Sequence, residues 1–237
     1  MVSRNASFHE GGIAGALLAP LKLAFALTLT FLGILVVAWI VDWTFVFKVW
    51  PDGIDRLKSI LAADLSLARD LAEWQDGVPG AVTGTANFLY GVVFRVTGVH
   101  DMGMRFAEGA ALSIPDTIVR NTYMANREAI EVAMIGTQLL GVRLATLVLI
   151  APLLVLIYIV AGVDGLTQRA IRRASGGRES ASLYHRAKHL QVAVLTMGTL
   201  GILLWPSSFD PLLIVVPLVA AVGAFARLQW AYYKKHL

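Results

Sequence analysis

Residues 144–163 read LATLVLIAPLLVLIYIVAGV, and residues 164–189, directly after them, read DGLTQRAIRRASGGRESASLYHRAKH. The first run is apolar and uncharged, and it has the length of about 20 residues at which an α-helix crosses the roughly 30 Å hydrocarbon core of a membrane. The second run, called here the basic loop, holds six Lys or Arg residues against two Asp or Glu. This pattern is typical of a membrane-spanning helix followed by a cytoplasmic loop.

Three further apolar stretches accompany this one. Residues 23–43 predict a first span, and residues 190–205 and 212–228 predict two more, joined by a short turn at residues 206–211. Hydrophobic residues make up 57% of the chain and charged residues only 15%, against roughly 25% charged residues in soluble domains. The sequence therefore predicts an all-α membrane protein with about four transmembrane helices.

The basic residues are distributed unevenly along the chain, which predicts its orientation. Residues 48–143 hold nine Lys or Arg against eleven Asp or Glu, whereas the basic loop holds six against two. Because basic loops stay in the cytoplasm, we expect the basic loop, the N-terminal segment (1–22) and the tail (229–237) on that side. The segment between the first two spans (44–143), called the intervening segment, is then periplasmic. The chain is then expected to be a multi-pass membrane protein with both termini cytoplasmic.

The first span is predicted to be a retained anchor. Its apolar run is longer than the 7–15 residues of a signal-peptide core. It ends near Trp39, Trp43 and Trp50, which predict an aromatic belt at the membrane interface. Asp42 lies at the same end, so we expect it to be an interfacial carboxylate rather than part of a proton relay.

The intervening segment is predicted to be α-helical. Asp52–Trp74 repeats apolar residues at three- and four-residue spacing, as an amphipathic helix does. Gly84–Val99 is more apolar but short for a span, and it could be interfacial, re-entrant or buried. A third helix is expected to start with Ser113 as its N-cap. Since no helix breaker follows before Gly136, this helix is expected to continue into the second span as one rod.

The residue inventory argues against enzymatic chemistry. The chain has no cysteine, which excludes thiol catalysis, disulfides and cysteine-ligated metal clusters. No glycine-rich segment has the GxxxxGK[ST] spacing of an ATPase, and no serine lies in G-x-S-x-G. His185 and His189 share a helix face, but Arg186 and Lys188 beside them would repel a cation. We expect neither an enzyme nor a cofactor or metal site.

A second class of function stays open, which is a small membrane transporter or a membrane enzyme with an unrecognised site. Transporters place polar or ionisable groups near the middle of their spans. The predicted spans hold Thr and Tyr side chains, and their only charged residues are Asp42 at the end of the first and Arg227 at the end of the fourth. A central cavity lined by polar residues would favour this alternative.

The basic loop carries more charge than orientation requires, so it is the candidate contact site. A helix continuing from the second span is expected to end at residues 175–177, and another to restart at Glu179 and lead into the third span. The candidate partner-binding residues are Arg169, Arg172, Arg173, Arg178, Glu179, Tyr184, His185, Arg186 and Lys188.

In this loop the chain resembles an inner-membrane protein family of integrating conjugative elements, a domain of unknown function encoded beside the coupling ATPase of a type IV secretion system. The resemblance lies in Asp164-Gly165-Leu166, Gln168-Arg169 with Arg172-Arg173, Gly-Arg-Glu-Ser at 177–180 and Tyr-His-Arg-Ala-Lys at 184–188. It extends to the order of one span, a long segment and three later spans.

The resemblance implies a non-enzymatic component of conjugative DNA transfer in a bacterial inner membrane, an assembly partner of the coupling ATPase or of other type IV secretion membrane proteins. Arginine side chains suit such a contact because they pair with carboxylates through two parallel hydrogen bonds. Anionic lipids are the second partner expected for the loop. Direct contact with nucleic acid ranks last, because the basic residues are not interleaved with aromatic residues.

Overall fold

The computed structural model describes residues 12–73, 79–107, 114–176 and 181–233, and within these ranges it contains helices and no strand. The elements are α1 (Gly12–Thr44), the π-helical turn η1 (Phe45–Val49), α2 (Gly53–Glu73), α3 (Pro79–Tyr90), the π-helical turn η2 (Gly91–Arg95), α4 (Val99–Ala107), α5 (Ile114–Ala125), α6 (Arg127–Ala174), α7 (Ala181–Leu204) and α8 (Pro211–Ala231). The predicted all-α class is confirmed.

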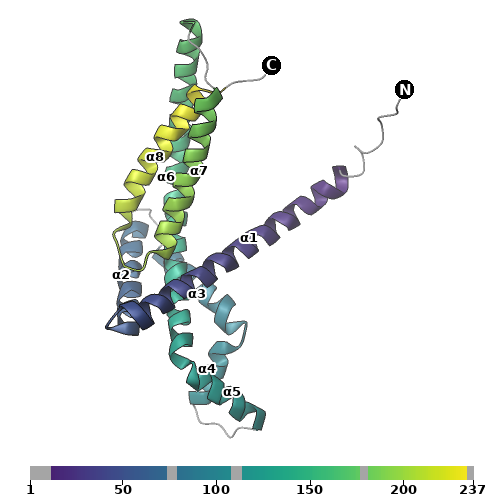
Figure 1. The fold of residues 1–237 in the computed structure, drawn as a ribbon, viewed down its shortest axis with the longest axis vertical. Coiled ribbons are helices and arrows are strands. Elements are labelled where there is room, and N and C mark those ends of the chain that lie inside the picture. Colours follow the sequence, from purple (N-terminus) through teal and green to yellow (C-terminus); the bar gives the residue numbers. More distant parts are fainter. Residues whose placement is uncertain (1–11, 74–78, 108–113, 177–180, 234–237) are drawn as a thin grey trace, which may run out of the picture.

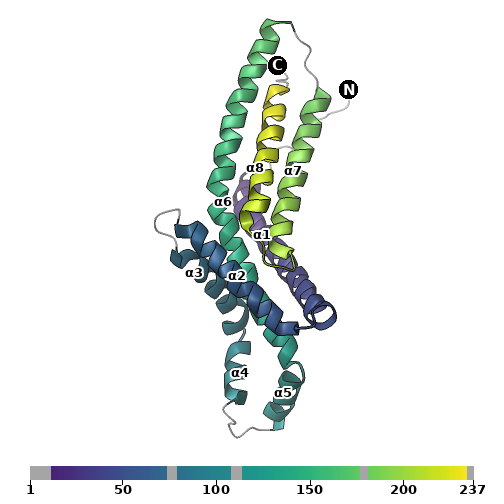
Figure 2. The same ribbon diagram turned by 90° about the vertical axis from the view of Figure 1, so that its left-hand side faces the viewer.

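The helix α6 is the axis of the molecule (Figures 1 and 2). Its 48 residues make it roughly 70 Å long at 1.5 Å per residue, more than twice the thickness of a hydrocarbon core. The helices α7 and α8 run along its C-terminal half, and α2 and α3 pack along its N-terminal half. The long helix therefore joins an apolar bundle to a separate helical layer.

Four of the described helices are long and apolar enough to span a membrane. These candidate spans are Ala19–Val49, Arg127–Ala174, Ser182–Leu204 and Pro211–Ala231. They contain the four apolar stretches that the sequence predicts.

The helix α1 joins the bundle through only part of its length. Leu35 and Ala38 are buried in a cluster with Leu140 of α6 and Leu203 of α7. Residues 19–30, by contrast, are all exposed, and this N-terminal half diverges from α7 and α8 (Figure 1). A helix that is apolar and exposed on all sides has the composition expected of a helix surrounded by lipid.

The connection between α7 and α8 is a short turn, as predicted. Pro211 occupies the first position of α8, where its missing N–H costs no hydrogen bond. The Asp210 carboxylate accepts a hydrogen bond of 2.9 Å from the backbone N–H of Leu212 and so caps the helix. These residues reverse the chain and hold α7 and α8 antiparallel.

The predicted amphipathic helix of the intervening segment is confirmed as α2. Its apolar face, including Leu57 and Ala68, is buried in clusters with residues of α6. The predicted Gly84–Val99 helix begins earlier, at Pro79, and forms α3 and η2. A Cβ on Gly141 of α6 would lie 2.6 Å from the Cα of Ala86, so α3 packs against α6 at backbone distance and is half-buried.

The prediction of one uninterrupted rod from Ser113 was wrong. A helix does begin at Ile114, but it ends at Ala125, and α6 starts at Arg127. The backbone of Asn126 departs from helical geometry, with φ −111° and ψ 13°, and its side-chain amide donates to the Thr122 carbonyl at 2.9 Å. Ser113 itself lies outside the described residues, and the helix α4 was not predicted.

Trp39 and Trp43, which were predicted to belong to an aromatic belt, are half-buried against α6. The indole N–H of Trp39 donates to the Thr137 hydroxyl at 3.0 Å, and that of Trp43 donates to the Ala129 carbonyl at 2.9 Å. Asp42 between them is 7% exposed. One helical face of α1 thus turns all three side chains toward α6, a partner that is distant in sequence.

Candidate functional site

The predicted contact residues lie on the facing ends of α6 and α7. Arg169, Arg172 and Arg173 belong to the last turns of α6, which ends at Ala174. Tyr184, His185, Arg186 and Lys188 belong to the first turns of α7. Arg178 and Glu179 lie outside the described residues. The break of the helix at Ser175 and Gly176 is confirmed, with Gly176 at a positive φ of 70°.

Arg172 contacts the C-terminal end of α8 instead of pointing into solvent. Its Nη1 donates to the Ala231 carbonyl at 3.1 Å, and its guanidinium carbon lies 3.9 Å from the ring centroid of Tyr232. The final carbonyls of a helix lack an intrahelical partner and carry the negative end of its dipole. Arg172 therefore caps α8.

Two more predicted contact residues pack against the same end of α8. The guanidinium carbon of Arg169 lies 5.4 Å from the ring centroid of Tyr233. Tyr184 of α7 packs edge-on against Tyr233, with 5.7 Å between ring centroids. Trp230 completes this group at 5.9 Å from Tyr233. Trp230, Tyr232 and Tyr233, called the α8 aromatic cluster, join the ends of three helices.

The remaining described contact residues are exposed. Arg173 lies on α6, and His185, Arg186 and Lys188 lie on α7 around the buried Ala187. The nine predicted residues therefore do not form one surface. Three of them pack inside the protein, four face outward, and two lie outside the described residues.

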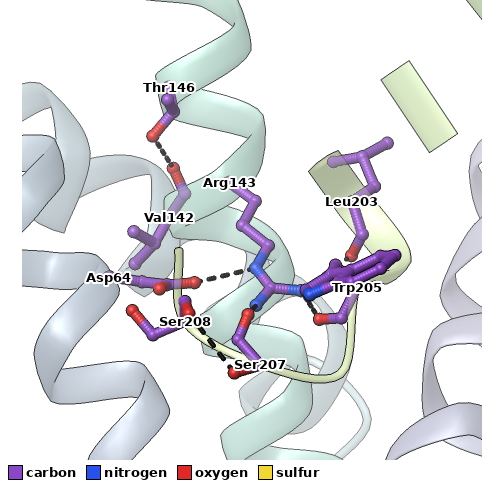
Figure 3. A network of polar contacts seen from close by, with 8 residues as sticks. All are labelled: Asp64, Val142, Arg143, Thr146, Leu203, Trp205, Ser207 and Ser208. Atoms are coloured by element: carbon purple, nitrogen blue, oxygen red, sulfur yellow. Dashed lines mark hydrogen bonds and ion pairs between the residues drawn. The ribbon is translucent and has the colours of Figure 1, made fainter. Parts of the chain in front are cut away.

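A second polar site, which the sequence analysis did not identify, surrounds Arg143 near the middle of α6 (Figure 3). Its Nε donates to the Asp64 carboxylate of α2 at 2.8 Å. Its Nη1 donates to the carbonyls of Leu203 at 3.3 Å and Trp205 at 2.6 Å, and its Nη2 donates to that of Ser207 at 3.1 Å. Arg143 thus caps α7 and ties the α7–α8 turn to α2.

This pair is deeply buried, with the side chains of Arg143 and Asp64 only 6% and 9% exposed. The other oxygen of Asp64 has no hydrogen-bond partner among the described residues. The two cavities beside Arg143 have volumes of about 20 and 10 Å³, room for about one water molecule each. Asp42 lines the smaller one. The contacts of Arg143 hold α2, α6 and the turn between α7 and α8 together.

The sequence does contain a signal for this pair. Asp64 follows Leu61 by three residues and precedes Ala68 by four, so it lies on the apolar face of α2. Arg143 is likewise preceded and followed by apolar residues. A charged residue on an apolar face indicates a buried partner of opposite charge, although the spacing cannot say which one.

Among the described residues, no group of three or more His, Asp or Glu side chains is arranged to hold a metal ion. The polar contacts around Arg143 and Arg172 join arginine side chains to carbonyls, a carboxylate and an aromatic ring. These contacts join helices, and they leave a small set of basic side chains facing outward.

Comparison with known proteins identifies the chain. The model of a family described as "DtrJ-like: IncC plasmid conjugative DNA transfer protein DtrJ-like" matches residues 69–234. No curated protein and no solved structure matches. The match includes the whole basic loop and confirms the resemblance to conjugative-element proteins.

Proposed function

This chain belongs to the DtrJ-like family of conjugative DNA transfer proteins, and we propose that it is a non-enzymatic inner-membrane component of DNA transfer that binds the coupling ATPase. The observation that carries this proposal is the set of outward-facing basic residues Arg173, Arg186 and Lys188. The other described arginines of the basic loop, Arg169 and Arg172, pack against α8, whereas the side chains of these three are exposed.

The proposal includes a definite arrangement in the membrane. The helices α1, α6, α7 and α8 cross the bilayer, and the basic loop and both termini are cytoplasmic. The intervening segment is periplasmic. Its position beside the N-terminal half of α6, away from the basic loop (Figure 2), supports this arrangement, as does the charged outer face of α2.

An acidic protein surface is the partner we favour for the exposed basic residues. Guanidinium groups orient a bound protein through paired hydrogen bonds to carboxylates. Anionic lipid attracts each basic residue near the membrane surface by about 1 kcal/mol, and it adds no orientation. Nucleic acid ranks third, because the aromatic residues near the loop already pack within the protein and so offer no stacking platform.

The proposal assigns binding rather than turnover to this chain. Its buried ionisable pair has all but one of its polar atoms engaged with protein groups, and the adjacent cavities hold about one water each. Asp42, Asp64 and Arg143 line these cavities, but cavities of this size do not favour the transporter alternative. ATP hydrolysis by the purified protein, abolished by a point substitution within it, would contradict this part of the proposal.

The test is capture of the coupling ATPase from solubilised membranes with the double variant Arg186→Ala and Lys188→Ala. Loss of a charge-assisted contact at an interface costs about 2–5 kcal/mol, so we expect captured ATPase to fall more than tenfold. The matched control is Arg56→Ala with Arg69→Ala, which removes two exposed basic residues of α2. Equal capture by the test variant and the control would contradict the proposal.

A further inference from the structure

The α8 aromatic cluster lies where α6, α7 and α8 end together. Tyr232 and Tyr233 directly follow the last helical residue of α8, Ala231. Each tyrosine ring lies under a different arginine of α6. These arginines were predicted to bind a partner, yet both are already half-buried within the protein itself.

The same cluster reaches α7, which carries most of the exposed basic residues. Tyr184 packs against Tyr233 and against its neighbour His185 at 5.3 Å between ring centroids. Arg186 and Lys188 follow within the next turn. The position of α7 relative to α6 at this end is therefore fixed through α8, in addition to the loop that connects them.

Polar contacts support the cluster from one side. Arg227 of α8 forms an ion pair with Asp164 of α6. A Cβ on Gly165 would lie 2.5 Å from the Arg227 carbonyl, so the two helices meet at backbone distance here. Such close packing leaves α8 little freedom to move relative to α6, which makes it a rigid support for the rings.

We infer that the α8 aromatic cluster positions the basic residues for partner binding, with Arg169, Arg172 and Tyr184 as positioning residues and Arg173, Arg186 and Lys188 as contact residues. This inference rests on the proposed function and deepens it, since it says which residues touch the partner and which hold them in place. Arranging the charges before binding reduces the entropy lost on association.

The experiment measures position and binding separately. The chain has no natural cysteine, so Ala170→Cys on α6 and Ser182→Cys on α7, both exposed, give two unique spin-label sites outside the positioning and contact residues. Pulsed electron spin resonance on the full-length protein in lipid nanodiscs reports the distance distribution between them. Capture of the coupling ATPase is measured on the same variants without labels.

We expect a narrow distribution in the parent protein. Tyr232→Ala with Tyr233→Ala is expected to broaden it at least twofold and to lower captured ATPase at least fivefold. Tyr232→Phe with Tyr233→Phe is the matched control, because it keeps the ring faces on which the arginines stack. This control is expected to retain both the narrow distribution and the capture.

Two results would overturn the inference. One is an unchanged distance distribution in the alanine variant, and the other is a broadened distribution with undiminished capture. Failure of the proposed function would give a different result. Capture of the coupling ATPase would then be undiminished when Arg186 and Lys188 are replaced in a protein whose aromatic cluster is intact.

Discussion

Arg143 and Arg172 belong to the same helix, α6, and each donates a hydrogen bond to a carbonyl near the C-terminal end of another helix, but their surroundings differ. Arg143 lies at the C-terminal end of α7, where it donates to the Leu203 carbonyl, and Arg172 caps the C-terminal end of α8. They are 29 residues apart, or roughly 44 Å along an α-helix. The helix α6 thus holds the α7–α8 hairpin at both ends through cations placed at the negative ends of helix dipoles.

The difference between the two arginines lies in burial and in partners. Arg143 is 5% exposed and is paired with a carboxylate from the intervening segment. Arg172 is half-buried and uses one carbonyl and one tyrosine ring. A buried ion that loses its partner is costly, whereas a half-exposed one can turn to water. We therefore expect the contacts of Arg143 to contribute more to the free energy of unfolding, and those of Arg172 to position the basic residues nearby.

The largest contrast is expected in the side of the membrane from which the two ends of the molecule can be labelled. Ser66→Cys on α2 and Ser175→Cys after α6 place a single exposed thiol at each end. On whole cells, a membrane-impermeant maleimide is expected to label Cys at position 66 once the outer membrane is permeabilised, and to leave position 175 unlabelled. Labelling only at position 175 would reverse the proposed orientation.

The next largest effect concerns stability at the Arg143 end. Arg143→Ala leaves the buried Asp64 carboxylate unpaired, and we expect a loss of about 3–5 kcal/mol in the free energy of unfolding. Denaturant unfolding of the purified protein in detergent measures this loss. Lys58→Ala is the matched control, because its 2.9 Å ion pair with Glu131 also joins α2 to α6 but lies at the surface.

The hydrogen bond to Glu131 raises the pKa of Lys58 above its usual value, so Lys58 is charged at neutral pH. Its removal is nevertheless expected to leave the unfolding midpoint near that of the parent protein. Equal effects of the Arg143 and Lys58 variants would contradict the distinction between a buried and a surface pair.

Helix contact near the Arg172 end gives a smaller effect. Gly165→Ala would place a Cβ 2.5 Å from the Arg227 carbonyl, so α6 and α8 must separate, at a cost of about 1–3 kcal/mol. Gly201→Ala is the matched control, because no atom lies within 4 Å of its added Cβ. Unfolding midpoints of the two variants would be compared, and a Gly165 variant as stable as the Gly201 variant would argue against the close packing.

The smallest effect on stability is expected for Arg172 itself. Arg172→Ala removes a contact with the face of Tyr232 and a cap on α8, and we expect a loss of about 1 kcal/mol in the free energy of unfolding. The same denaturant measurement checks this value. A loss as large as that of Arg143→Ala would contradict the expectation that the buried contacts of Arg143 stabilise the protein more than the half-buried contacts of Arg172.

The sequence predicted the elements of this fold better than their pairing. Apolar length and charge asymmetry identified the four long helices, and the spacing of Leu57, Leu61 and Ala68 identified α2. The break at Asn126 was missed because the non-helical backbone of this residue is not marked by a helix breaker in the sequence. The Arg143–Asp64 pair was missed because its partners are 79 residues apart, and a pattern along one helix does not name the residue that faces it.

The candidate site shows the same limit. Charge density selected the basic loop, which lies within the matched region of the family model. Charge density could not separate Arg172 from Arg173, because the tyrosine that covers Arg172, Tyr232, lies 60 residues later in the chain. Arg172 and Arg173 are adjacent in the sequence and therefore point to different sides of α6, since successive residues of a helix are 100° apart.

The most direct test of the account is DNA transfer frequency in conjugating cells that carry Arg186→Ala with Lys188→Ala. The account predicts at least a tenfold fall in transfer, with normal abundance and membrane insertion of the variant. Arg56→Ala with Arg69→Ala is expected to transfer DNA at the parent frequency. Parent-level transfer by the Arg186 and Lys188 variant would contradict the claim that the exposed basic residues of this loop are the functional contact.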